Sequence, residues 1–311
     1  MRRRKNFGNN SKLMSIILVL VGFLYVINDS FGFIYEDSFD GIDDRIKTED
    51  VVSLGEDLSV HYIDVGQADS ILIERNQEYM LIDGGNNVDG PLLVDYFKDL
   101  GITSFKYLVA THPHEDHIGG LDDVIDNFDI GTIYMPDVIT TSKTFEDLLD
   151  SIENKNLTFN VPVIGSSFKL GDSDFTVIYT GMDTSDLNNT SIVLRMVYGN
   201  TSFLFTGDAT DVTEEKIINQ NIQTDVLKVG HHGSKYSTTD KFLAKVNPKY
   251  AVISVGSDNK YGHPASSTIN KLNSANIETY RTDQDGTVIA ESDGNDIKFS
   301  TVKTNTNGGL G

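Results

Sequence analysis

The chain has 311 residues, enough for one large domain or two small ones, and its 39% hydrophobic content is typical of a globular protein with a buried core. It contains no cysteine, which excludes disulfide scaffolds and thiolate metal sites, so any metal must be held by imidazole, carboxylate, amide or water. The net charge is -21 at pH 7, and such an acidic surface repels DNA unless a metal or a local basic patch intervenes.

Residues 1–30 are typical of a membrane-targeting segment. A basic run from Arg2 to Lys5 precedes residues 13–27, which are apolar apart from one serine and one glycine. In helical form this stretch is shorter than the ~30 Å bilayer core, although residues 31–35 can extend it. No clean small-x-small cleavage site follows, which favours an uncleaved anchor over a cleaved signal peptide. The positive-inside rule then places the rest of the chain outside the cytoplasm, held at the cell membrane by a single pass, or secreted if the segment is cleaved.

Composition also marks the boundaries of the folded part. Residues 31–55 are rich in Asp, Glu, Ser and Gly without a clear period, which predicts a linker. Residues 304–311 are Asn, Thr, Gly and Leu and predict a flexible tail. One continuous domain is therefore expected over residues 56–303.

The domain is predicted to open with strands. Residues 59–64 form the first strand, and residues 70–74 and 79–82 are short apolar runs separated by polar residues, which predicts a hairpin. Residues 91–100 have apolar side chains at helical spacing after an initial proline. Residues 107–110 form a buried strand that runs directly into a histidine cluster.

Beyond this cluster, strands and helices are predicted to alternate. Strands are expected at residues 175–179, 192–198, 202–206, 226–229 and 250–255 and near Val288 and Ile297, and helices at residues 121–128, 145–152, 212–218, 240–246 and 267–275. Strands first, then an alternation, then strands again fits two sheets with helices on the outside.

The strongest chemical signal is the run Thr-His-Pro-His-Glu-Asp-His-Ile-Gly-Gly at residues 111–120. It holds three of the seven histidines of the chain, together with carboxylates, directly after an apolar strand. On a loop at a strand end, His112 and His114 can point one way and Asp116 and His117 another. That arrangement suits two metal ions held close together, which is the geometry of two-metal hydrolysis.

This run resembles the His-x-His-x-Asp-His motif of the metallo-β-lactamase superfamily and, more narrowly, the hydrolase domain of ComEC-type competence proteins and their stand-alone relatives. Further stretches match in the family's order, at residues 61–70 (ending Gly-Gln-Ala-Asp-Ser), 81–85, 204–208, 226–234 (ending Lys-Val-Gly-His-His-Gly-Ser) and 261–264. The resemblance covers about residues 57–300. It implies an α+β fold, the αββα sandwich, with the site at the edges of the sheets.

The resemblance implies a role for each residue of the motif. His112 and His114 would bind the first metal, and Asp116 and His117 the second. Asp208 would be the carboxylate that bridges the two. A bare carboxylate at the end of an apolar strand is costly unless it is paired or metal-bound, which agrees with this role. Asp116 is also counted among the catalytic residues.

The matched stretches also contain four more histidines and the carboxylate of Asp83. One of His231 and His232 should complete the second metal; we expect His231, with His232 left as a catalytic residue that orients ligands or contacts substrate. His263 is assigned to catalysis, as a phosphate or leaving-group contact or an alternative ligand. Asp83 is expected to orient a ligand, and His61 to be structural.

One departure from the superfamily concerns the first metal. Many members supply another histidine just before the strand that leads to the bridging carboxylate, where this chain has Leu-Asn-Asn-Thr-Ser at residues 187–191. The ComEC-like subgroup shares this pattern. Zn2+ is the default ion. Because asparagine is a weaker ligand than imidazole, the harder Mn2+ is an alternative. Asn189, Ser234 and Lys235 are candidate substrate contacts, with Lys235 placed to meet an anion.

A pair of divalent metals is expected to lower the pKa of a bound water and to present hydroxide to an electrophile. The resemblance implies phosphodiester hydrolysis, of DNA or another nucleic acid, although the acidic body opposes tight DNA binding. The alternative is a cell-wall phosphodiesterase such as a teichoic-acid phosphorylcholine esterase, for which a cationic choline suits the acidic body; without tryptophan, an aromatic cage would need Tyr or Phe. A non-catalytic surface module on the same fold is the third possibility, opposed by the nearly complete ligand set.

Overall fold

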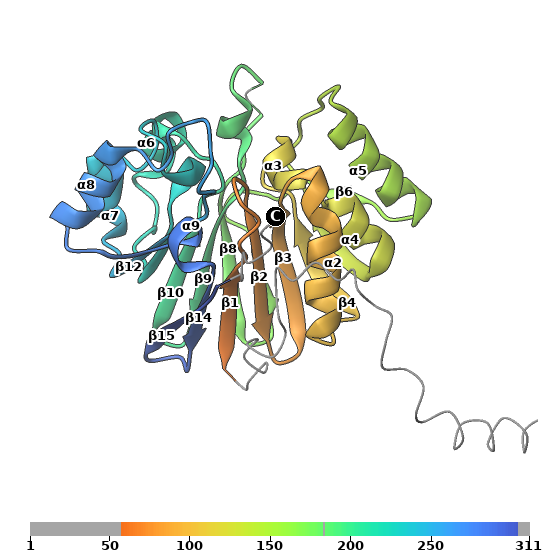
Figure 1. The fold of residues 1–311 in the computed structure, drawn as a ribbon, viewed down its shortest axis with the longest axis horizontal. Helices are drawn as coiled ribbons and strands as arrows, with labels where there is room; N and C mark the ends of the chain where they lie inside the picture. Colours follow the sequence, from red (N-terminus) through yellow and green to blue (C-terminus); the bar gives the residue numbers. More distant parts are fainter. Residues whose placement is uncertain (1–56, 183, 304–311) are drawn as a thin grey trace, which may run out of the picture. The chain divides into compact units, whose positions relative to one another are not determined.

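The computed structural model describes residues 57–182 and 184–303. They form two β-sheets packed face to face, with helices on the outer face of each sheet (Figure 1). This arrangement confirms the predicted αββα sandwich. The predicted membrane segment, linker and tail (residues 1–30, 31–55 and 304–311) lie outside the described residues. Within the described part of the chain, no helix is long and apolar enough to cross a membrane.

The first sheet has eight strands in the order β15-β14-β1-β2-β3-β4-β5-β6. They are β1 (Leu58–Tyr62), β2 (Ser70–Arg75), β3 (Glu78–Gly84), β4 (Ser104–Val109), β5 (Asp129–Tyr134), β6 (Phe159–Asn160), β14 (Thr287–Ser292) and β15 (Ile297–Val302). The predicted hairpin is confirmed: β2 and β3 are antiparallel around Asn76 and Gln77, which both have positive φ, as a tight two-residue turn requires. Strands β3 to β6 are parallel, so their carboxyl ends share one edge.

The second sheet has seven strands in the order β13-β12-β11-β10-β9-β8-β7. They are β7 (Ser167–Leu170), β8 (Ser173–Tyr179), β9 (Val193–Tyr198), β10 (Thr201–Phe205), β11 (Val226–Lys228), β12 (Tyr250–Ile253) and β13 (Glu278–Arg281). Strands β10 to β13 are parallel. The segments that follow β10, β11 and β12 therefore also leave the sheet at a common edge.

Side-chain alternation builds three apolar layers. On β2, Ile71 and Ile73 face the second sheet, whereas Leu72 faces the helices. Phe203 and Phe205 extend the inter-sheet layer from β10. Helices α2 (Gly90–Asp99), α4 (Leu121–Asn127) and α5 (Lys143–Asn154) cover the first sheet, and α6 (Asp211–Ile217), α7 (Asp240–Val246) and α8 (Ser266–Ser274) cover the second (Figure 1). Short turns complete the set: η2 (Asn87–Asp89), α3 (Glu115–Ile118), η3 (Leu187–Thr190), η4 (Gly230–Gly233) and α9 (Thr282–Asp285).

Strands β5, β6, β7 and β13 have no counterpart among the strands expected from the sequence. They lie at or next to sheet edges, and several of their side chains stay partly or fully exposed. A strand that is only partly covered does not need a continuous apolar run, so its pairing partner rather than its composition defines it.

Glu74, in β2, is a carboxylate buried within the fold. Only 2% of the residue is exposed, and its Oε2 has no hydrogen-bond partner among the described residues. Burial raises the pKa of Glu74 to about 7, against the opposing effect of Arg75. The folded state therefore favours the neutral carboxyl.

Because folding raises its pKa, Glu74 contributes most to the stability of the folded state below its ordinary pKa of 4.5. This contribution is lost as the pH rises through about 7. We expect Glu74→Gln to stabilise the protein at pH 8 by about 2 kcal/mol, after allowance for partial solvation, and to change little at pH 5. Thermal unfolding at both pH values measures this, with Glu291→Gln on β14 as the control. A shift of equal size at the two pH values would refute the assignment.

Candidate metal centre

The candidate metal ligands gather where the carboxyl edges of the two sheets meet. Asp83 is the penultimate residue of β3, and the histidine-rich segment follows β4. From the second sheet, Asp208 follows β10 and His231 with His232 follow β11. Side chains more than 90 positions apart in the sequence thus reach one place because parallel strands end at the same edge.

The segment after β4 is part loop and part helix. The chain bends at His112 and Pro113, and His114 is the N-cap residue of α3 (Glu115–Ile118). The backbone N–H of His117 donates to His114 O at 3.1 Å, which closes this single turn. Asp116 and His117 are therefore helical residues, whereas His112 and His114 lie in the loop before the helix.

Four side chains form a compact group of possible ligands. One atom from each of Asp116, His117, Asp208 and His232 lies within 4.8 Å of the others. His117 Nε2 is 3.3 Å from Asp208 Oδ1, and His232 Nε2 is 3.2 Å from Asp116 Oδ2. Two imidazoles and two carboxylates around one point are a ligand set for a divalent transition metal.

His112 and His114 form an adjacent pair. His112 Nε2 lies 3.0 Å from His114 Nδ1, so both nitrogens are directed at the same place. The other nitrogen of His112 lies 3.2 Å from Thr111 Oγ1 and 3.5 Å from Ser191 Oγ. The ring of His112 is centred 4.1 Å from that of His117, so this pair adjoins the group of four.

The two consecutive histidines after β11 take different positions. Both have positive φ, 51° at His231 and 50° at His232, so their side chains diverge. His232 is buried and joins the carboxylates. The His231 side chain is 23% exposed, its Nε2 lies 3.7 Å from Asp208 Oδ2, and its ring is centred 5.6 Å from that of His263. The geometry favours His232 as the ligand, whereas the sequence suggested His231.

Hydrogen bonds on the far side of two imidazoles set their orientation. Asp83 accepts from Thr111 N, Thr111 Oγ1 and His117 Nδ1, each at 2.7 Å. His232 Nδ1 donates to the carbonyl of Ser254 at 2.9 Å, because a carbonyl can only accept. In its neutral form, each ring would therefore present an unprotonated Nε2 to the carboxylates of the group of four.

Such an arrangement requires positive charge. A lone pair on His232 Nε2 facing the Asp116 carboxylate is repulsive unless a proton or a metal cation lies between them. His117 Nε2 and Asp208 Oδ1 are both buried and have no hydrogen-bond partner among the described residues. A divalent cation satisfies all of these atoms, so the residues present fit a metal ion held by imidazole and carboxylate.

The ionisation behaviour agrees. Burial alone would lower the pKa of His232, but Asp208 and Asp116 outweigh it and raise the pKa to about 10. For His117, burial is likewise outweighed by Asp208 and Asp83, and its pKa rises well above the usual value. Burial opposes ionisation of Asp208, yet His117 and His232 hold its pKa well below the usual range. The group holds ionised carboxylates, which makes it a strong cation site.

Removal of bound metal is expected to destabilise the fold. A ligand at about 1,000 times its Kd stabilises by about 4 kcal/mol, which corresponds to roughly 10 °C in Tm for a domain of this size. We therefore expect a chelator to lower Tm by about 10 °C, and added Zn2+ or Mn2+ to restore it. Differential scanning calorimetry provides the measurement, and the Asp208→Asn variant is the control in which the chelator should have little effect. An unchanged Tm in the parent chain would contradict metal binding.

A cavity of about 300 Å³ opens onto these residues. It is lined by Gln67, His114, Glu115, Asp116, Asn188, Asp208, His231, His232, Tyr261 and His263. No lysine or arginine is among these described lining residues. Burial lowers the pKa of His263, and His231 adds to this effect. The cavity therefore offers carboxylates, neutral imidazole and one exposed tyrosine ring.

The three predicted substrate contacts lie outside this lining. Asn189 is buried, and its Oδ1 accepts from the hydroxyls of Thr210 and Thr213 at the start of α6. Ser234 is also buried, and the ammonium of Lys235 lies 4.9 Å from the centre of the Tyr236 ring. The structure instead brings Asn188 to the cavity, with a buried Oδ1 that has no partner among the described residues. The prediction from the sequence chose Asn189, whereas the cavity is lined by its neighbour Asn188.

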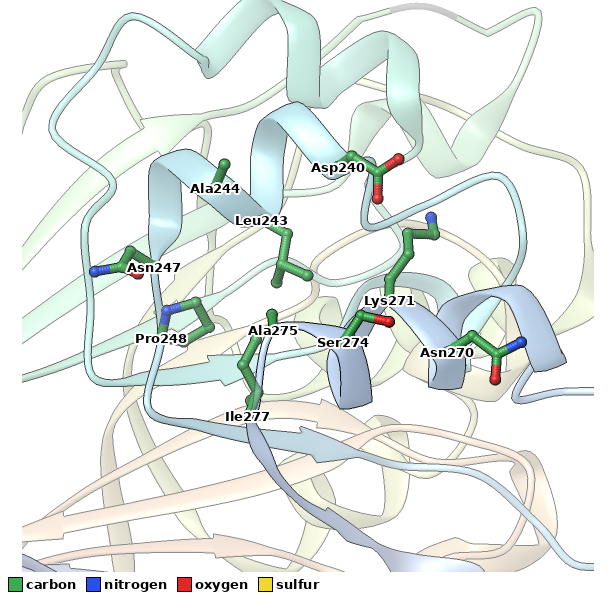
Figure 2. Close-up of a pocket in the computed structure, with 10 residues that line it drawn as sticks. All are labelled: Asp240, Leu243, Ala244, Asn247, Pro248, Asn270, Lys271, Ser274, Ala275 and Ile277. Carbon is green, nitrogen blue, oxygen red and sulfur yellow. The ribbon is translucent and has the colours of Figure 1, made fainter.

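A larger hollow, of about 430 Å³, lies between α7 and α8 (Figure 2). Figure 2 shows the residues that line it: Asp240, Leu243, Ala244, Asn247, Pro248, Asn270, Lys271, Ser274, Ala275 and Ile277. None of them is a histidine, and none belongs to the group of four. Size alone therefore does not mark the chemical site of this fold.

Comparison with known proteins agrees with this picture. A family model described as "Metallo-beta-lactamase superfamily" matches residues 63–257. ComE operon protein 3 of Bacillus subtilis is 30% identical over 250 residues, which cover 74% of this chain and 32% of that protein. Competence protein ComA of Neisseria gonorrhoeae is 29% identical over 228 residues, which cover 72% of this chain and 30% of that protein. The chain thus spans less than a third of the length of these two relatives.

Among solved structures, the diiron β-hydroxylase CmlA from Streptomyces venezuelae superposes with a TM-score of 0.52 at 13% identity, over 80% of this chain and 55% of that one. Identity at this level supports the fold alone. The resemblance carried by the sequence motifs is confirmed by the family model and by the competence relatives.

Proposed function

Since the chain belongs to the metallo-beta-lactamase superfamily, a fold of metal-dependent hydrolases, we propose that it hydrolyses phosphodiester bonds, in nucleic acid or in a related polymer. The observation that carries this proposal is the convergence of His112, His114 and the group of four, four of which (His114, Asp116, Asp208 and His232) line one cavity. The competence relatives support a nucleic-acid substrate.

We assign the ligands from the geometry. His112 and His114 would hold one metal, and Asp116, His117 and His232 the other. Asp208 would contact both metals. Its carboxylate oxygens lie 3.3 Å from His117 Nε2 and 3.7 Å from His232 Nε2, and His112 adds to the lowering of its pKa. Divalent cations bound there supply Lewis acidity and acidify water near neutral pH. Zn2+ is the first candidate and Mn2+ the second.

The remaining cavity residues would act on the substrate. The Asp116 side chain is 30% exposed, so it can contact attacking water while it binds metal. His231 and His263 lie side by side on the lining, and the lowered pKa of His263 keeps its ring neutral at pH 7. A neutral imidazole can donate a hydrogen bond to a phosphate oxygen. Since the described lining has no lysine or arginine, neutralisation of the phosphate charge would fall to the metals and these rings.

The test is turnover of bis-p-nitrophenyl phosphate by the chelated chain before and after addition of Zn2+ or Mn2+. We expect hydrolysis only with added metal, and none with Asp208→Asn. Nicking of plasmid DNA and cleavage of single-stranded oligonucleotides then test nucleic acid as the substrate. If the metal-loaded chain cleaved no phosphodiester, the proposal would fall.

A cell-wall phosphodiesterase, such as a teichoic-acid phosphorylcholine esterase, is the second candidate. The carboxylates of the cavity lining and the exposed ring of Tyr261 at its rim favour a substrate that carries a cationic group. Release of p-nitrophenol from p-nitrophenyl phosphorylcholine, compared with the plain diester, distinguishes the two. A preference for the choline ester that is lost in Tyr261→Ala would establish the second candidate.

The cellular location remains a proposal from the N-terminal sequence. Residues 1–30 combine a basic run with an apolar stretch, and we propose that they anchor the chain with its hydrolase domain outside the cytoplasm. Protease digestion of intact cells that express the chain tests this. Protection of the domain in intact cells would contradict it.

A further inference from the structure

A buried ion pair lies next to His232 on the side of its Nδ1 atom. Lys228 is 0% exposed and Asp69 is 1% exposed. Lys228 Nζ lies 2.9 Å from Asp69 Oδ2, and the other oxygen of this carboxylate, Oδ1, lies 3.3 Å from His232 Nδ1. Both residues lie in stretches that resemble the family, at residues 61–70 and 226–234, and neither is among the expected metal ligands or catalytic residues.

The pair is tied to the site from both sheets. Asp69 directly precedes β2; its backbone N–H donates to Asp116 O at 3.0 Å, and its carbonyl accepts from Gly85 N at 2.9 Å. Lys228 is the last residue of β11, and its ammonium also donates to the carbonyl of Val229. The backbone of Asp69 is thus fixed by two hydrogen bonds, and its carboxylate pairs with the Lys228 ammonium.

Fold stability alone does not explain these charges. Two charges removed from water lose much of their solvation, and replacement of buried ion pairs by apolar residues of similar volume is often neutral or stabilising. The position of the pair is informative instead, because the neighbouring imidazole also has a buried carboxylate beside its Nδ1. Asp83 is hydrogen-bonded to His117 Nδ1 at 2.7 Å, whereas Asp69 Oδ1 lies 3.3 Å from His232 Nδ1, whose hydrogen bond goes to the Ser254 carbonyl. Both imidazoles of the group of four therefore carry a buried carboxylate at the nitrogen that faces away from the metal position.

We propose that Asp69 and Lys228 are positioning residues for His232: Lys228 holds the Asp69 carboxylate against the Nδ1–H of the imidazole, so that Nε2 is directed at the metal and made a stronger ligand. The carbonyl of Ser254 sets the tautomer, and the carboxylate adds negative charge beside the same N–H. This inference rests on the metal centre of the proposed function. Asp69 and Lys228 would therefore affect the affinity for the metal bound by His232, and not for the one bound by His112 and His114.

The experiment measures metal binding by the full chain, independently of turnover. Zn2+ affinities of the two sites are obtained by competition with a chromophoric chelator, and Co2+ absorption spectra report the environment of each ion. For Asp69→Asn we expect one Zn2+ to bind about 10–100-fold more weakly and the other to change less than about threefold. The Co2+ spectrum should change for the weakened ion only.

Three further variants separate positioning from folding. Lys228→Met leaves an unpaired buried carboxylate and should lower Tm, whereas the double variant D69N/K228M removes both charges and should recover Tm while the weak Zn2+ affinity persists. Glu214→Gln is the matched control. It neutralises a buried carboxylate that accepts from the backbone of Thr238 and Thr239, outside the cavity lining, and should leave both affinities unchanged.

Each outcome decides the proposal. Unchanged affinities in Asp69→Asn and in the double variant would overturn it, and equal weakening of both metals would do so as well. If neither variant folded, the pair would serve the core and the inference would fall. Failure of the parent chain to bind metal would instead sink the proposed function, whereas metal binding without phosphodiester cleavage would leave this test fully informative.

Discussion

Replacement of Asp208 by Asn is expected to lower kcat/KM for a phosphodiester by about 10^3-fold or more. Asp208 is only 2% exposed, its Oδ1 lies 3.3 Å from His117 Nε2, and its Oδ2 lies 3.7 Å from both His231 and His232. An amide removes one of the two negative charges of the group of four. Loss of several kcal/mol of metal-derived transition-state stabilisation corresponds to this factor.

The Asp208 variant is checked by metal analysis and by turnover of bis-p-nitrophenyl phosphate. The parent chain should retain two equivalents of metal, and Asp208→Asn at most one after gel filtration. Asp172→Asn is the matched control, since this carboxylate is 58% exposed and forms a surface ion pair with Arg75, of little energetic value. Two retained metals together with normal turnover in Asp208→Asn would exclude the bridging role.

The second large effect separates two neighbouring histidines. His232→Ala is expected to lose one equivalent of metal and to reduce kcat/KM by about 10^3-fold, because His232 Nε2 points into the group of four. His231→Ala should keep both metals and reduce kcat by about 10^2-fold, the size of a lost substrate or proton-transfer contact. The physical basis is the direction of the two side chains: both rings line the cavity, but His232 is buried among the carboxylates, whereas the His231 side chain is 23% exposed.

Metal content of the two variants, measured side by side, decides the question, and each variant is the control for the other. If His231→Ala lost the metal and His232→Ala kept it, the assignment made from the sequence would stand and the geometric one would be wrong. Equal loss in both would mean that both histidines bind metal.

Much of the fold could be predicted because its strands are short apolar runs with clear ends. The hairpin of β2 and β3, the strand before the histidines and the helices on the outer faces all follow from local patterns. Strands β5, β7 and β13 could not be predicted, because they lie at or near sheet edges, where partial exposure relaxes the need for apolar residues.

The candidate site divides in the same way. The segment from His112 to His117 brings its ligands together within six residues, so their chemistry is visible before any folding is known. The choice of Asn188 over Asn189 as a cavity residue depended on which side chain the η3 turn directs outward. That orientation depends on the chain packed against the turn, which local sequence does not report.

By itself, the sequence determined the kind of chemistry: imidazoles and carboxylates at strand ends, no thiolate, and a family that the motifs identify. Only the tertiary structure decided the position and partner of each group. It places His232 among the carboxylates and pairs Asp69 with Lys228 across two sheets. The reason is physical. Ligand type is a property of single residues, whereas the direction of a side chain and the partner of a buried charge are set by contacts between segments far apart in the chain.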